Sequence, residues 1–435
     1  MVKTVYVYLF FMLPGFFIST EVRGQVYDTL TLPGCFRLAT ERFPLITGKQ
    51  ILNKQMSLED ENLKSAFYPE MNLNAGATYY SDVVTINVEP AVPGVTFPQP
   101  YHDQYAVTMD IRQMIYDGGE IRNRQKVQER SNAVKQQDLE VKLYAYKQKL
   151  ARIFFSALYL DDNYKILEQN LLQLRKATKE AEVAKEKGSI LQGDVNILKA
   201  SQLDIRQKMI ANRHDRIAVV KILEMYLDTI FPKEMVLNVP IPVMTAGPPA
   251  RPEFRLFSLQ QSWLDAGMQL QNVQRHPKFF GFGQVGYGRP GLNPLNENFK
   301  AFYLVGANLT WNIWDWNRTK RQKKILSFEQ ELVKNQEKLF YQQVKADLVK
   351  INEEIGKLEK IIELDKQRVL LRKEIMEEYA GKLSGGTITP AEYERQLSAW
   401  QNSQVQLNLH QKQLMEKHID YLITNGNLKD YEKQK

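Results

Sequence analysis

Apolar residues recur at alternating spacings of three and four along two long stretches of the chain, residues 119–187 and 318–383. In the first stretch the stripe runs through Leu143, Tyr146, Leu150, Ile153, Ala157, Leu160, Tyr164, Leu167, Leu171 and Leu174. This spacing places the apolar side chains on one helix face and is typical of a coiled-coil seam. Because residues 119–187 contain no proline, they predict one continuous helix about 100 Å long.

Four shorter segments alternate apolar and polar residues, which is the pattern of half-exposed β-strands. They are residues 71–79, 105–112, 279–288 and 303–313. Aromatic side chains gather near the ends of these segments: Tyr79, Tyr80, Tyr101, Tyr105, Trp311, Trp314 and Trp316. Strands of this length with aromatic ends are typical of transmembrane barrels. The alternative, a soluble sandwich, ranks second because each predicted hairpin is flanked by helices far too long for a compact sandwich.

The two halves of the chain repeat this layout at a spacing of 198 residues. Residues 105–117 align with residues 303–315, and Gly188 aligns with Gly386. A unit this long is too large for a solenoid repeat and indicates one duplicated structural module.

The predicted organisation follows the repeat. Repeat 1 spans residues 25–230 and comprises a short helix, a β-hairpin at 71–116, a long helix at 119–187 and a return helix at 192–230. A proline-rich linker spans residues 231–254, and a charged, loose tail follows residue 425 as residues 426–435. Repeat 2 spans residues 255–425 and comprises a helix at 256–275, a β-hairpin at 279–314, a long helix at 318–383 and a return helix at 389–424.

The first 24 residues predict a signal peptide, because Lys3 precedes a mostly apolar run that ends near Ser19 and Gly24 offers a small residue for cleavage. We therefore expect export from the cytoplasm. After Ser19 the sequence has no run of eighteen apolar residues, so it predicts no transmembrane helix in the mature chain. Such a chain can still span a membrane with strands in a closed barrel. Four strands cannot close a barrel, so this interpretation requires several copies.

The charge pattern and the cysteine count exclude other classes of protein. The net charge is +8, but basic and acidic residues interleave along the helices, as Lys and Glu do over residues 345–360, which is typical of solvated coiled-coil faces and not of a nucleic-acid patch. The single cysteine, Cys35, excludes an internal disulfide and a cysteine-rich metal site. Its setting after Pro33 and Gly34 resembles a lipidation site, but it lies too far beyond the apolar run. We expect instead a small residue in a short helix that begins near Thr31.

Catalytic signals are weak. The glycine pattern at residues 281–286 matches a dinucleotide-binding loop, but Pro290 follows where that site needs a helix. The sequence has no zinc-protease motif and no phosphate-binding loop, and its five histidines are scattered. We predict no enzymatic activity, no cofactor and no metal ion.

The two strand-to-helix junctions, residues 114–122 and 313–318, together with the tip turns at Gly188 and Gly386, resemble the TolC-like family of outer-membrane efflux proteins. Residues 30–32 and 251–253, which open the two modules, share the resemblance. It covers essentially the whole mature chain. It implies an α+β membrane protein in which a homotrimer shares a twelve-stranded β-barrel, four strands per protomer, continued by a long α-helical coiled-coil tunnel.

The resemblance also implies a location, partners and a function. The protein would lie in the lipid of the outer membrane, extend into the periplasm and dock a periplasmic adaptor (membrane fusion) protein and an inner-membrane transporter. It would serve efflux or type I secretion as a passive exit duct, with no nucleic-acid partner. The alternative is a soluble periplasmic coiled-coil scaffold or adaptor. The alternating strands with aromatic ends favour the channel.

The family closes its tunnel at the periplasmic tip with acidic side chains a short way into the return helices. The resemblance therefore indicates Asp194 and Glu392, each six residues after its tip glycine, as gate candidates. Glu392 also completes a capping box with Thr389, so a purely structural role for both acids stays open. The candidate residues for the barrel lumen are Asp110, Arg112 and Asn308, which lie on the polar sides of their strands.

Overall fold

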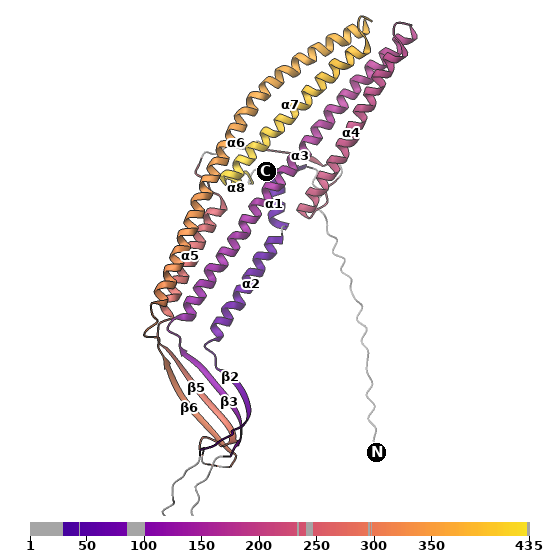
Figure 1. Cartoon of the computed structure of the whole chain (residues 1–435). Coiled ribbons are helices and arrows are strands. Elements are labelled where there is room, and N and C mark those ends of the chain that lie inside the picture. The colour runs from indigo at the N-terminus through magenta and orange to yellow at the C-terminus, as the bar shows by residue number, and fades with distance from the viewer. Residues whose placement is uncertain are drawn as a thin grey trace, which may run out of the picture.

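The computed structural model describes residues 29–42, 44–84, 101–232, 235–240, 247–294, 296 and 298–432. The predicted signal peptide and most of the proline-rich loop of the first hairpin lie outside the described residues. The chain forms a long, curved wall of helices with a β-sheet at one end (Figure 1). Among the described helices, none has the length and apolar character needed to cross a membrane.

The sheet joins the two predicted hairpins. Its strands are β2 (Glu70–Tyr79), β3 (Asp103–Tyr116), β5 (Lys278–Arg289) and β6 (Lys300–Thr310), all antiparallel in the order β2-β3-β5-β6. The repeats therefore meet at β3 and β5. The prediction that the second hairpin continues to residue 314 is wrong. Thr310 pairs with Lys278, the first residue of β5, and Pro277 before it has no N–H to extend the ladder.

Four long helices form two hairpins that point away from the sheet (Figure 1). They are α3 (Glu120–Glu186), α4 (Gln192–Leu227), α6 (Arg318–Ser384) and α7 (Pro390–Asn425). Helices α3 and α6 each have 67 residues, and α4 and α7 each have 36. The equal lengths follow from the sequence repeat. Helix α4 ends three residues before the predicted limit, because Asp228 adopts a left-handed conformation with φ 45°.

Two shorter helices fill the half of the wall nearest the sheet. Helix α2 (Pro44–Ser65) packs on α3, and α5 (Pro252–Val273) packs between α3 and α6. The row is therefore α2-α3-α5-α6 near the sheet and α4-α3-α7-α6 near the tips. Each row is four elements wide, like the sheet.

The start of the first repeat differs from the prediction of one short helix. Helix α1 (Leu32–Arg42) is followed by α2, which begins at Pro44. Proline cannot continue the preceding helix because it lacks an N–H and restricts the residue before it. The start of α1 tolerates Pro33 and Gly34 because the Thr31 hydroxyl accepts the Gly34 N–H at 3.1 Å.

The proline-rich linker predicted for residues 231–254 contains regular structure, and the expectation that it holds no helix is wrong at its end. These residues contain β4 (Val236–Asn238), which pairs in parallel with β1 (Thr29–Thr31), and Leu237 is buried. They also contain the start of α5, four residues earlier than predicted. Pro252 occupies the first helical turn, where a missing N–H costs no helix hydrogen bond.

The loose tail predicted for residues 426–435 is also wrong for its described part. Helix α8 (Leu428–Glu432) docks on the wall through the buried side chains of Leu428 and Tyr431. The Glu432 carboxylate lies 2.7 Å from Lys147 Nζ on α3. Two apolar residues three apart in a charged segment gave too little periodicity to predict a docked helix.

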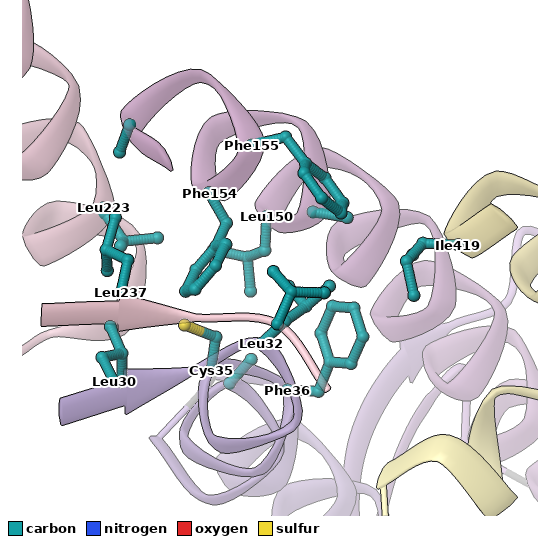
Figure 2. Packing of buried hydrophobic residues seen from close by; sticks show 14 of the residues in the cluster. Leu30, Leu32, Cys35, Phe36, Leu150, Phe154, Phe155, Leu223, Leu237 and Ile419 are labelled. Atoms are coloured by element: carbon teal, nitrogen blue, oxygen red, sulfur yellow. The ribbon is translucent and has the colours of Figure 1, made fainter. Parts of the chain in front are cut away.

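The main hydrophobic core lies midway along the wall. Helix α1 and strands β1 and β4 pack there against α3 and the inner ends of α4 and α7 (Figure 2). Leu32, Cys35 and Phe36 from α1 meet Leu150 and Phe154 from α3 in this cluster. The cluster joins both repeats, because Leu223 and Ile419 reach it from the two return helices.

The burial of Cys35 predicts an inert thiol. Its side chain is 0% exposed, and this burial raises the pKa of the thiol well above its usual range. We expect Cys35 in the folded protein to resist a maleimide for hours and to react fully once denaturant is added. Mass spectrometry of the labelled chain measures this. Rapid labelling of the folded protein would contradict the packing in Figure 2.

Candidate functional site

The two faces of the sheet differ in chemistry. One face is apolar and exposed, and its large side chains are Met71, Leu73, Tyr79, Tyr105, Val107, Met109, Val285, Tyr287, Tyr303, Val305 and Leu309. The opposite face carries the three residues predicted for a lumen, Asp110, Arg112 and Asn308. Residues directly opposite each other in an antiparallel sheet point to the same side, so the strand register fixes this division.

Asp110 is the centre of a hydrogen-bond network on the polar face. Its carboxylate accepts the side-chain amides of Asn74 on β2 and Gln284 on β5, each at 2.6 Å, and the Thr108 hydroxyl at 3.3 Å. The network crosses three strands and links the two repeats. Arg112 takes no part in it, because its guanidinium lies 4.3 Å from the centroid of the Phe280 ring.

Two phenylalanine rings lie flat on glycines across β5 and β6. Phe282 covers Gly306, and Phe302 covers Gly286, so closely that a Cβ on either glycine would clash with the ring. Each ring therefore lies along the sheet instead of projecting from it. Gly286 lies in β5 and Gly306 in β6, so each strand contributes one ring and one glycine to the arrangement.

The helical hairpins turn at the two predicted tip glycines. Gly188 has φ 76° and Gly386 has φ 71°, which are left-handed conformations that glycine adopts without strain. The Ser189 N–H donates to the Ala184 carbonyl at 2.9 Å, and the Thr387 N–H donates to the Lys382 carbonyl at 3.0 Å. Both turns lie at the end of the molecule opposite the sheet (Figure 1).

The two gate candidates begin the return helices at equivalent positions. A carboxylate oxygen of Asp194 accepts the Leu191 N–H at 3.1 Å, and Glu392 accepts the Thr389 N–H at 2.9 Å. Hydrogen bonds from the backbone and the hydroxyl of Thr389 hold the pKa of Glu392 below its usual range. The capping geometry is therefore present at both acids. Glu392 is exposed and Asp194 is half-buried, so each acid also presents charge to solvent.

A buried ionic contact near the middle of α6 and α7 was missed from the sequence. Asp365 is 4% exposed; its carboxylate lies 2.7 Å from Arg368 Nη2 and 2.5 Å from His410 Nδ1. The signal was present, because Asp365 interrupts the apolar stripe where the first repeat has Leu167. Among the described residues, no group of three or more His, Cys, Asp or Glu is placed to hold a metal ion.

One part of the chain is similar to a known protein family. Residues 61–224, which include the first hairpin and most of its helices, match the family model described as "Outer membrane efflux protein". The match covers less than half of the chain. No curated protein matches the sequence.

Solved structures share the fold of this chain over nearly its whole length. A CusC structure is 10% identical with a TM-score of 0.69 and covers 92% of both chains. VceC of Vibrio cholerae is 14% identical with a TM-score of 0.64, over 91% of this chain and 96% of its own. The open state of the MtrE channel of Neisseria gonorrhoeae is 13% identical with a TM-score of 0.64, over 91% and 88%. The CusC structure is described in terms of transmembrane channel formation, and the MtrE structure is described as an outer-membrane channel.

Proposed function

We propose that this chain is an outer-membrane efflux protein and that three copies of it form one water-filled duct across the outer membrane and the periplasm. A periplasmic adaptor protein and an inner-membrane transporter deliver the cargo, and the duct itself is passive. The observation that carries this proposal is the pair of free edges of the wall. Every row is four elements wide, and each row ends in an element with no neighbour on its outer side among the described residues.

In a lipid environment, the free edges of the sheet need other strands to pair with. Strands β2 and β6 each pair on one side within the described chain. Unpaired backbone N–H and C=O groups are costly in hydrocarbon, so an edge exposed to lipid is unstable. Pairing of β2 in one copy with β6 in the next satisfies both edges. Three sheets joined in this way give a closed twelve-stranded barrel with the apolar face outward and Asp110 inward.

The free edges of the helical wall carry apolar seams that suit the same closure. Leu203, Ile210 and Ile217 are exposed on α4 at seven-residue spacing, and Leu364 and Leu371 are exposed on the tip half of α6. Near the sheet, α2 exposes Ile51 and Leu58, and α6 exposes Ile325, Leu332 and Leu339. Heptad spacing is the pattern of a helix that packs against another helix. Each seam on α6 therefore faces a seam at the same height along the helical wall of a neighbouring copy. The scaffold alternative leaves these seams without a partner.

At the tips, we infer that Asp194 and Glu392 form rings of carboxylates that favour cations at the periplasmic entrance. The variants Asp194→Asn and Glu392→Gln remove charge but keep an acceptor oxygen for each cap. In planar bilayers we expect the double variant to lower the cation-over-anion permeability ratio by at least about twofold. Asp204→Asn, farther along α4, is the matched control.

The pH dependence gives a second readout of the Glu392 ring. Because the folded-state pKa of Glu392 is lowered, the carboxylate keeps its charge as pH falls through the usual range for glutamate. Its contributions to cation preference and to the start of α7 are present above the ordinary pKa and are lost as pH falls through the lowered one. An unchanged permeability ratio in the double variant would leave the two acids as helix caps alone.

A further inference from the structure

Three tryptophans are exposed at the junction between the sheet and the second long helix. Trp311, Trp314 and Trp316 are 57%, 68% and 78% exposed and lie between the end of β6 and the start of α6. The rings of Trp314 and Trp316 contact each other edge to face, with centroids 5.9 Å apart. Exposed indoles of this number form an apolar surface that a water-soluble protein would normally cover.

The backbone conformation at Trp316 is strained for a residue with a large side chain. Trp316 has φ 53° and Asn317 has φ 60°, both in the left-handed region. The equivalent residues of the first repeat are Gly118 and Gly119, with φ 70° and 86°. Glycine adopts this conformation freely, whereas a bulky side chain is strained there. Since the indole of Trp316 is largely exposed, burial within the described chain does not offset the strain. A contact between this indole and a partner outside the described chain can offset the strain.

Positive charge surrounds the same indoles. The exposed cations of the junction are Arg275, Arg318, Lys320, Arg321 and Lys324. The Arg321 guanidinium donates to the Trp316 carbonyl at 2.8 Å, and that of Arg275 donates to the Ile313 carbonyl at 3.0 Å. The first turn of α6 contains no acidic residue, although a helix N-terminus disfavours cations.

The first repeat lacks this concentration of charge. Glu120 stands at the position of Arg318 and pairs with Arg124 and Lys278, and Asn123 stands at the position of Arg321. The carboxylate within the second junction, Asp315, accepts the Thr319 N–H at 2.9 Å as a helix cap. The basic and aromatic surface is therefore a property of the second junction.

We propose that this junction binds anionic phospholipid headgroups at the periplasmic surface of the outer membrane. The indoles lie in the interfacial layer, and the guanidinium and ammonium groups contact lipid phosphates. This inference rests on the proposed function, which places the adjoining apolar face of the sheet in lipid. That face reaches the junction, because Leu309 lies on it one residue before the end of β6, and the exposed Trp311 directly follows the strand.

A neighbouring copy is a poorer occupant for the cations. The edge that closure would bring near them is α2, whose acids are Glu59, Asp60 and Glu61. Glu59 and Asp60 are already bonded within the chain, which leaves the exposed Glu61 as one carboxylate against five cations. Glu59 accepts from Gln128, and Asp60 accepts from Gln125 and pairs with Lys64. Anionic lipid supplies the negative charge that the second junction lacks.

Native mass spectrometry of the full-length protein tests the proposal. The protein is mixed in detergent with equal amounts of phosphatidylglycerol and phosphatidylethanolamine, and the lipids that it retains after release from the detergent are measured. We expect the wild type to retain phosphatidylglycerol at least about fivefold over phosphatidylethanolamine, and Arg318→Gln with Arg321→Gln to reduce this ratio to about one. Arg122→Gln with Lys126→Gln, at the first junction, is the matched control and keeps the preference. Equal retention of both lipids by the wild type would overturn the proposal.

Trp316→Gly separates lipid binding from a structural role. Glycine relieves the strained backbone, so we expect equal or higher thermal stability in detergent together with lower retention of phosphatidylglycerol. Loss of copies from the assembly in this variant would show that the indole contacts another subunit, and so would overturn the lipid assignment. Bilayer conductance is measured on every variant. If it persists while the lipid preference is absent, the inference fails and the proposed duct stands.

Discussion

Replacing Val305 by arginine is expected to prevent the protein from entering the outer membrane as a stable assembly. Val305 is 76% exposed at the centre of β6 and lies on the apolar face of the sheet. An arginine that faces lipid near the bilayer midplane costs about 2–4 kcal/mol in each copy. The cost applies to every subunit of a closed barrel. Quantitative blotting of isolated outer membranes, with and without heating before electrophoresis, measures the loss.

The neighbouring residue provides the matched control. Leu304 is 44% exposed, and it pairs with Gln284 on the polar face. An arginine there would face water in the duct, so Leu304→Arg is expected to assemble at nearly the wild-type level and to alter conductance instead. Normal assembly of Val305→Arg together with failure of Leu304→Arg would mean that the polar face meets the membrane.

The second large effect is expected from Phe154→Ala in the central core. Phe154 is 0% exposed and packs edge to face on Phe155, with ring centroids 6.4 Å apart (Figure 2). Its removal leaves a cavity where α1, α3 and the short parallel strands meet, at a cost of about 3–5 kcal/mol. Urea denaturation of the detergent-solubilised protein, followed by circular dichroism, measures the change. Leu172→Ala, on an exposed position of the same helix, is expected to change stability by less than about 0.5 kcal/mol.

Much of the architecture could be predicted from periodicity. The long helices follow from a stripe spaced by three and four, and the strands follow from strict alternation, because these patterns act over many residues. Strand β4 and helix α8 could not be predicted in this way. Each is short, and each is stabilised by residues distant in the chain, such as Leu30 beside Leu237 and Lys147 beside Glu432.

The candidate site also contains features that local pattern could predict and features that depend on contacts between distant residues. The polar face holding Asp110 follows from alternation within one strand, so it could be predicted locally. The bond between Asp110 and Gln284 depends on how β3 and β5 align, and hydrophobic pattern alone does not set that register between repeats. The contact between Asp365 and His410 joins two helices. The interruption of the apolar stripe indicated Asp365, but nothing in the sequence pattern indicated His410 as its partner.

The central claim is that several copies close their free edges into one duct. The direct measurement is the mass of the unheated protein, extracted from outer membranes in mild detergent, by light scattering corrected for bound detergent. The account predicts a complex of three chains. A single chain that stays soluble without detergent would contradict it and would favour a periplasmic scaffold.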